Sequence, residues 1–215
     1  MAVRHKIFIV TAATLAVLAF SLARPKAADA QTIIDEWANV KPPPAPELKP
    51  ASADPKTTAL LMLDFLKQNC GVRPRCVASV PRVKTLLDAA RAAKATVIYS
   101  FFGAAKANDI IDPGLAPEAG DASVTSSANK FLNTDLERML KDKGIQTVIT
   151  VGSAANGAVL YTASSAALRG FKVIVPVDGI SSDDLYTEQF TAWQLANGPA
   201  FADLVTLTTT DRIKF

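Results

Sequence analysis

The stretch TALLMLD, at residues 58–64, decides the fold class, because it is apolar on both faces and ends in an acid. Further short apolar stretches predict strands at residues 95–102, 146–151, 171–177 and 204–207. Between the stretches, apolar spacing and end signals predict helices at residues 81–93, 133–143, 155–168 and 184–196. Strands that are apolar on both faces and alternate with helices indicate a parallel sheet covered by helices on both sides. We therefore predict an α/β fold with a doubly wound, mostly parallel sheet flanked by helices on both faces, in a Rossmann-like three-layer arrangement.

The first thirty residues have the pattern of an export signal. Arg4 and Lys6 precede an apolar run at residues 7–23, and Ala28-Asp29-Ala30 forms a small-x-small exit. This order is typical of a cleavable signal peptide. The alternative is an uncleaved membrane anchor, for which this apolar run would have about the shortest length that can cross a bilayer. We predict cleavage after Ala30 and a periplasmic or secreted protein, with no membrane attachment once the signal is removed.

The next segment, residues 31–56, is predicted to be a proline-rich N-terminal leader. Ile33, Ile34 and Trp37 fit one short helical turn, and KPPPAP at residues 41–46 is extended, polyproline-like chain. Such a leader would wrap the surface or cross to another subunit, and we expect a homo-oligomer. Residues 57–215 are then one domain with a full-sized core.

Charge and composition exclude several function classes. The chain has 23 Lys and Arg against 20 Asp and Glu, and removing residues 1–30 takes away four basic residues and one acid, which leaves 19 of each. We therefore expect no nucleic-acid partner. The one histidine, His5, leaves with the signal, so no histidine can ligate a metal or act as a base. Nucleotide-binding glycine patterns are absent, and we expect neither metal nor cofactor.

Two cysteines, Cys70 and Cys76, stand close together in CGVRPRC. An even pair in an oxidising compartment predicts a disulfide, and a reactive thiol or a metal pair would have no histidine to support it.

Ligands of doubly wound sheets bind at the carboxyl ends of the strands. Asp64 follows the first strand, and we interpret it as functional rather than as a loop-anchoring acid. Phe65 and Phe102 could line a pocket or pack in the core. Asn156 could line it or cap a helix. Asp178 fits a turn residue better than a catalyst.

Three stretches in order resemble the isochorismatase-like hydrolases, also called the cysteine hydrolase superfamily. They are LLMLD ending at Asp64, KFLNTDL at residues 130–136, and GSAANGAV at residues 152–159. The resemblance covers roughly residues 57–210. It implies an aspartate, a lysine and a nucleophilic cysteine that attacks an amide-type carbonyl, with backbone amides near a non-proline cis peptide holding the oxyanion.

Carried over by position, the resemblance places Asp64 on the family's aspartate and Ala158 on its cysteine. The usual place of the lysine lies near residues 124–125, and Lys130 is the nearest candidate; otherwise Lys130 is a surface lysine entering a helix. The cis peptide would fall at Ala154-Ala155. The amides of Ala154, Ala155 and Ala158 would face an anion at the helix start.

An alanine cannot act as nucleophile, so thiol-based amide hydrolysis is excluded if these positions match. We expect a hydrolase that acts on a small organic substrate by cysteine-independent acid-base chemistry with Asp64 and Lys130, as in the family branch that hydrolyses the vinyl ether isochorismate. Export argues against isochorismate itself. The alternatives are an inactive protein of the same fold that binds a small ligand, and an assembly role for the leader.

Overall fold

The computed structural model describes residues 32–215, so the predicted signal peptide at residues 1–30 lies outside the described residues. The described chain falls into a short segment that ends at Pro42 and a compact unit from Pro43 to Phe215. In the short segment, α1 (Ile33–Glu36) and the 3-10 turn η1 (Trp37–Asn39) form the expected helical turn. The compact unit begins before residue 57, where we expected the domain to start.

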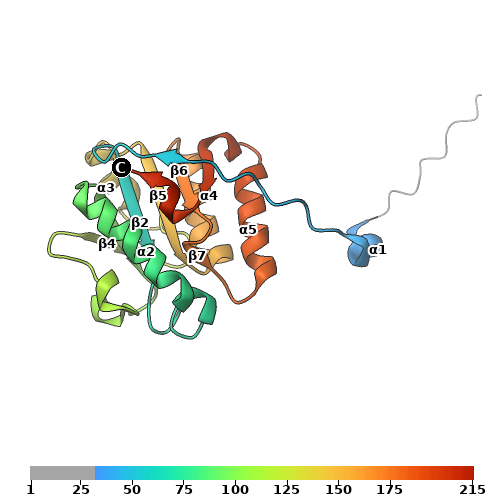
Figure 1. Cartoon of the computed structure of the whole chain (residues 1–215), viewed down its shortest axis with the longest axis horizontal. Coiled ribbons are helices and arrows are strands. Elements are labelled where there is room, and N and C mark those ends of the chain that lie inside the picture. Colours follow the sequence, from blue (N-terminus) through green and yellow to red (C-terminus); the bar gives the residue numbers. More distant parts are fainter. Residues whose placement is uncertain (1–31) are drawn as a thin grey trace, which may run out of the picture. The chain divides into compact units, whose positions relative to one another are not determined.

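A seven-stranded parallel sheet forms the centre of the compact unit (Figure 1). Its strand order is β4-β3-β2-β5-β6-β8, and β7 pairs with β5 beyond the end of β6. The strands are β2 (Thr58–Leu63), β3 (Thr96–Phe101), β4 (Ala122–Thr125), β5 (Thr147–Ser153), β6 (Lys172–Pro176), β7 (Ile180–Ser181) and β8 (Val205–Thr208). The central β2 is buried along its whole length, as the apolar stretch predicted.

Helices cover both faces of this sheet (Figure 1). On one face, α2 (Pro74–Ala92) buries Val83 and Leu87 against strand residues such as Met62. On the other face lie α3 (Leu136–Asp142), α4 (Leu160–Leu168) and α5 (Leu185–Asn197), and their core side chains pack with the alternate residues of the strands. The predicted α/β fold with a mostly parallel sheet and helices on both faces is therefore confirmed.

Two helices differ from their predicted bounds. We expected a helix from Pro81, but α2 begins at Pro74 and continues through Pro81. Pro74 fits the first turn of α2, because the N–H that a proline lacks would have no partner there. We expected α3 to start near Asn133, yet Asn133 has a φ of 55°, so the backbone cannot be helical there. The helix starts at Leu136, whose N–H donates to Thr134 Oγ1 at 3.3 Å.

The second half of the predicted leader is part of the compact unit. Strand β1 (Ala51–Ser52) pairs in parallel with β9 (Ile213–Lys214) at the end of the chain, and Ala51 and Ala53 are buried. Lys49 N–H also donates to the carbonyl of Leu207 on the outer strand β8 at 2.8 Å. This segment, residues 43–53, is called the strap. It covers a sheet edge that would otherwise leave backbone groups unpaired.

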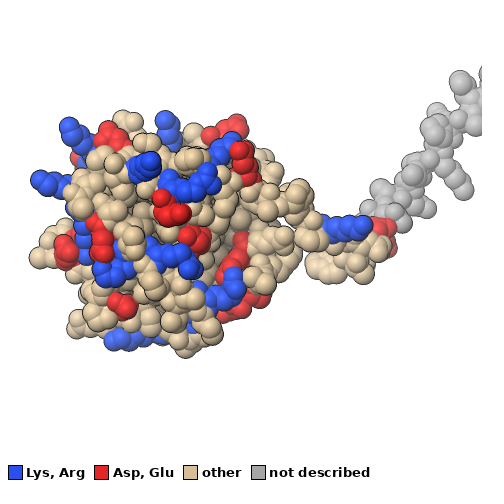
Figure 2. Space-filling model, in the orientation of Figure 1, with Lys and Arg blue, Asp and Glu red and all other residues tan. Residues whose placement is uncertain are grey.

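The remaining short helical turns lie in the connections. They are η2 (Ala107–Asp109), η3 (Pro113–Leu115), the π-helical turn η4 (Ala155–Val159), η5 (Ala202–Leu204) and η6 (Thr210–Arg212). Basic and acidic side chains are interspersed over the face of the molecule shown in Figure 2.

Candidate functional site

Asp64 lies where β2 ends. Its φ of 54° turns the chain out of the strand, and aspartate is one of the few residues that adopt this conformation readily. The side chain is buried, with 3% of the residue exposed. Its Oδ1 accepts a hydrogen bond from Ser100 Oγ at 2.8 Å, and Ser100 belongs to the neighbouring strand β3. Ser100 therefore holds the carboxyl group of Asp64 from one side.

Lys130 holds the Asp64 carboxyl group from the other side. Its Nζ donates to Asp64 Oδ2 at 2.6 Å and to the carbonyl of Ser127 at 2.7 Å. The lysine is fully buried, which excludes the alternative of a surface lysine entering a helix. The structure therefore brings together the aspartate and the lysine that the sequence had placed 66 positions apart.

Burial raises the pKa of the Asp64 carboxyl above its ordinary value, while the charge of Lys130 and the hydrogen bonds from Lys130 and Ser100 act in the opposite direction. The two influences define a carboxyl group whose charge depends on its neighbours. A ligand that displaces the Lys130 ammonium from Asp64 would favour the protonated carboxyl.

A turn rich in backbone amides follows β5. Gly152 has a φ of 153°, and a Cβ there would lie 2.3 Å from the carbonyl oxygen of Leu63, so only glycine lets the ends of β2 and β5 approach this closely. The cis peptide lies at Ser153-Ala154, one position before the Ala154-Ala155 bond that we predicted. The π-helical turn η4 then begins at Ala155 and continues into α4.

The amides of this turn are partly engaged. The N–H groups of Gly157 and Val159 both donate to the carbonyl of Ala154, at 3.1 and 3.3 Å. The amides of Ala155, Asn156 and Ala158 have no carbonyl four residues earlier within the helix, as at any helix start. They are the groups from which an anionic oxygen could accept.

Ala158 precedes Thr162, the α4 residue that contacts the segment carrying Lys130. Thr162 lies about one turn after Ala158, and its Oγ1 accepts from the backbone N–H of Lys130 at 3.2 Å. The Ala158 side chain is buried within the core cluster that includes Phe131, the residue after Lys130.

No free thiol exists in this chain. Its two cysteines, Cys70 and Cys76, form the predicted disulfide with their Cα atoms 5.1 Å apart. Both cysteines are completely buried. Neither cysteine is therefore available as a nucleophile.

The three predicted pocket residues lie in different surroundings. Phe65 is buried in the core cluster on the α2 side of the sheet, so it packs there and does not line a pocket. Phe102 follows β3 and is 49% exposed. Asn156 is exposed, and its Oδ1 accepts from Ser182 Oγ at 2.9 Å. Asp178 accepts from the N–H and hydroxyl of Thr210, which supports its interpretation as a turn residue.

Sequence reasoning missed several hydroxyl groups at this end of the sheet. Ser100 was overlooked because one serine inside an apolar strand carries no pattern. Ser153 and Ser181 are paired positions of β5 and β7, both buried, and their hydroxyls have no hydrogen-bond partner among the described residues. Only the strand register brings these two serines together.

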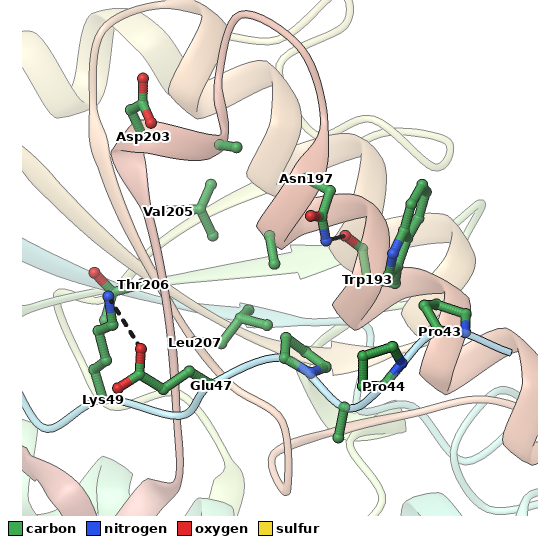
Figure 3. A pocket seen from close by; sticks show the side chains of 14 residues that line it. Pro43, Pro44, Glu47, Lys49, Trp193, Asn197, Asp203, Val205, Thr206 and Leu207 are labelled. Carbon is green, nitrogen blue, oxygen red and sulfur yellow. Dashed lines mark hydrogen bonds and ion pairs between the residues drawn. The ribbon is translucent and has the colours of Figure 1, made fainter.

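A separate hollow of about 720 Å³ lies between the strap, α5 and the outer strand β8 (Figure 3). Pro43 and Pro44 border one side, Trp193 and Asn197 another, and Thr206 the strand side. Neither Asp64 nor Lys130 lines this hollow, and it is separate from the candidate site.

Within residues 32–215, no group of three or more His, Cys, Asp and Glu side chains could hold a metal ion. The same part of the chain has no helix that is both long and apolar enough to cross a bilayer.

Solved structures with the same fold cover most of the chain. The cysteine hydrolase from Pseudomonas syringae pv. phaseolicola 1448A superposes with a TM-score of 0.65 over 79% of this chain and 94% of that one, at 22% identity. The isochorismatase-like hydrolase from Alkaliphilus metalliredigens gives a TM-score of 0.63 over 73% of this chain and 96% of that one, also at 22% identity.

Sequence relatives point to the same family. The secreted isochorismatase effector Isc1 of Verticillium dahliae is 32% identical over 119 residues, which are 50% of this chain and 62% of that protein. The N-carbamoylsarcosine amidase of an Arthrobacter species is 35% identical over 71 residues, 33% of this chain and 27% of the amidase. The chain thus spans less than two thirds of the length of these curated relatives. The model of the isochorismatase domain matches residues 58–209. The chain therefore belongs to the isochorismatase family.

Proposed function

We propose that this chain is a hydrolase of small organic molecules that works without a thiol, using Asp64 and Lys130 for acid-base chemistry. One observation carries the proposal: the buried Lys130 ammonium holds the Asp64 carboxyl at 2.6 Å, in a chain whose two cysteines are bonded to each other. In this proposal Ala158 occupies the place of the family's nucleophilic cysteine. The amides of Ala155 and Ala158 receive the oxygen of the substrate.

The chemistry that suits this arrangement is hydrolysis of an enol ether. The carboxyl proton of Asp64 adds to the terminal carbon of the double bond, and water then attacks the resulting oxocarbenium carbon. The water gives its proton back to the Asp64 carboxylate, and the hemiketal breaks into a carbonyl compound and an alcohol. Burial supports this role, because it favours the protonated carboxyl. Lys130 keeps the Asp64 carboxyl oriented. When an acidic group of the substrate separates Lys130 from Asp64, the Lys130 ammonium binds that acidic group instead.

We also propose that the protein acts outside the cytoplasm, after removal of residues 1–30. The Cys70–Cys76 disulfide and the secreted relative from Verticillium dahliae both fit an extracellular location. The signal pattern of the first thirty residues supports the same conclusion.

The test uses residues 31–215 with two substrate classes, small enol ethers bearing a carboxylate and N-carbamoyl amino acids. We expect hydrolysis of the enol ethers that persists after treatment with a thiol-alkylating reagent. The double variant Asp64→Asn/Lys130→Met removes both charges together, so that neither is left unpaired, and should abolish turnover while the circular dichroism spectrum stays native. Asp135→Asn, an exposed acid-to-amide change on the same domain, should leave turnover intact.

Turnover in the double variant would contradict the proposal. The alternative is a protein of this fold that binds a small acid without converting it, and the replacement of a nucleophile by Ala158 favours it. Saturable binding of the same compounds, measured by calorimetry, with no hydrolysis in the unmodified chain would establish that alternative.

A further inference from the structure

A second set of contacts connects the disulfide to the amide turn of the candidate site. It begins in the loop closed by Cys70 and Cys76, which carries Arg73 and Arg75. The loop is anchored in the body, since both cysteines are buried and the N–H of Cys70 donates to the carbonyl of the buried Leu66 at 2.7 Å. Arg75 lies in the first turn of α2, so the position of its backbone is fixed on both sides.

The guanidinium group of Arg75 binds Glu188 of α5 in a two-pronged contact. Arg75 Nε donates to Glu188 Oε1 at 2.8 Å, and Arg75 Nη2 donates to Oε2. The Glu188 side chain is 17% exposed, so it is much less accessible to water than an ordinary surface carboxylate. Paired contacts of this geometry fix orientation as well as distance. The two residues are 113 positions apart, and the contact connects helices on opposite faces of the sheet.

Glu188 also holds the segment that precedes α5. Its Oε1 accepts from the backbone N–H of Ser182 at 3.0 Å, and Ser182 is 2% exposed. The Ser182 hydroxyl in turn donates to Asn156 Oδ1 at 2.9 Å. Asn156 is the second residue of the π-helical turn η4, between Ala155 and Ala158.

We propose that Glu188 is a positioning residue, which fixes the amide turn at residues 155–158 by tying Asn156, through Ser182, to the disulfide-closed loop. Asn156 is exposed and its turn departs from α-helical geometry, so the bond from Ser182 replaces the support that a regular helix start would have. The role of this turn in binding substrate rests on the proposed function, whereas the tether itself does not.

The experiment measures amide hydrogen exchange by NMR in the chain 31–215 at Gly157 and Val159, the two amides of this turn that donate to the carbonyl of Ala154. We expect Glu188→Ala to speed exchange there about tenfold, the scale of one lost hydrogen bond to a buried partner. Glu188→Gln should be milder, because an amide oxygen can still accept from Ser182 N–H. The variant Cys70→Ser/Cys76→Ser should speed exchange at the same amides, since it removes the cross-link that holds the start of α2, where Arg75 lies.

The matched control is Asp88→Asn, which breaks the ion pair of Asp88 with Lys84 on the exposed side of α2 and should leave these two amides unchanged. Unchanged exchange at Gly157 and Val159 in Glu188→Ala, with α5 still protected, would overturn the proposal. If Glu188→Ala does not fold, Ser182→Ala removes only the last contact and must give the same increase, or the proposal fails.

Turnover separates this inference from the proposed function. With an active enzyme, Glu188→Gln should recover most of the kcat lost in Glu188→Ala, which a merely structural loss of α5 would not show. Faster exchange at Gly157 and Val159 in a chain that hydrolyses none of the test compounds would leave the tether standing and reject the proposed hydrolase.

Discussion

The end of β2 and the outer face of α3 contain the same kinds of groups in opposite surroundings. Lys130 and Asp64 form an ion pair whose side chains are 0% and 4% exposed, whereas Arg138 pairs with Asp142 on α3 with side chains that are 62% and 63% exposed. Each region also has a glycine with positive φ, Gly152 beside β2 and Gly144 after α3. The comparison teaches that burial, and not the type of contact, decides whether a charge or a glycine matters to this protein.

The largest expected difference concerns the ion pairs. Lys130→Met leaves the Asp64 carboxylate buried without its cation, and we expect a loss of about 3–5 kcal/mol in the free energy of unfolding near neutral pH. Urea denaturation followed by fluorescence would measure it. Arg138→Gln should give no measurable change, because water solvates both partners of that pair. Equal losses in the two variants would contradict the comparison.

The glycines give the next effect. Gly152→Ala places a Cβ 2.3 Å from the carbonyl oxygen of Leu63, so the strand ends must separate, and we expect a loss of roughly 3 kcal/mol from forced overpacking. Gly144→Ala meets nothing within 4 Å, and only the cost of a left-handed alanine remains, about 1–2 kcal/mol. Thermal unfolding of the two variants would test the order, and the reverse order would show that the ends of β2 and β5 are not tightly packed.

The smallest expected effect is the pH dependence, and its sign differs between the regions. The folded-state pKa of Asp64 is raised by burial, so its contribution to stability is complete below the unfolded-state pKa and is lost as pH rises through the folded value. The pKa of Glu137 on α3 is lowered by its hydrogen bonds with Lys141 and Arg169, so its contribution is present above the unfolded-state pKa and is lost as pH falls through the folded value.

Carbonyl-carbon NMR of the two carboxyl groups would follow these titrations separately. Because the charge and hydrogen bond of Lys130 lower the pKa of Asp64, Lys130→Met should raise that pKa further and leave the Glu137 titration unchanged. A lower pKa of Asp64 in this variant would show that the lysine does not act on the carboxyl as the contacts indicate.

Much of the architecture could be predicted from local patterns. The apolar stretches gave β2, β3, β5 and β6 to within a residue or two, since a strand buried on both faces has few polar positions. The edge strand β4 (Ala122–Thr125) was missed, because a half-exposed edge strand has no such pattern. Pro81 misled the prediction of α2, because a proline is expected at a helix start, whereas this helix continues through it with the neighbouring Val80 and Val83 buried.

The candidate site was predictable only in part. Asp64 and the amide turn stood out because they follow strands, and the cysteine spacing indicated the disulfide. Ser100, Ser182 and Glu188 left no signal, since each acts through a partner far away in the sequence: Ser100 lies 36 positions from Asp64 and Glu188 lies 113 from Arg75.

The sequence by itself determined which segments must be buried, which pair of cysteines could close a loop, and that residues 31–215 contain no histidine. These properties follow from composition and from patterns over a few residues. Only the tertiary structure decided that Lys130 turns inward onto Asp64 and that Glu188 joins the disulfide loop to Asn156. The register of parallel strands and the packing of helices on them set those distances, and both depend on contacts between parts of the chain that no local pattern relates.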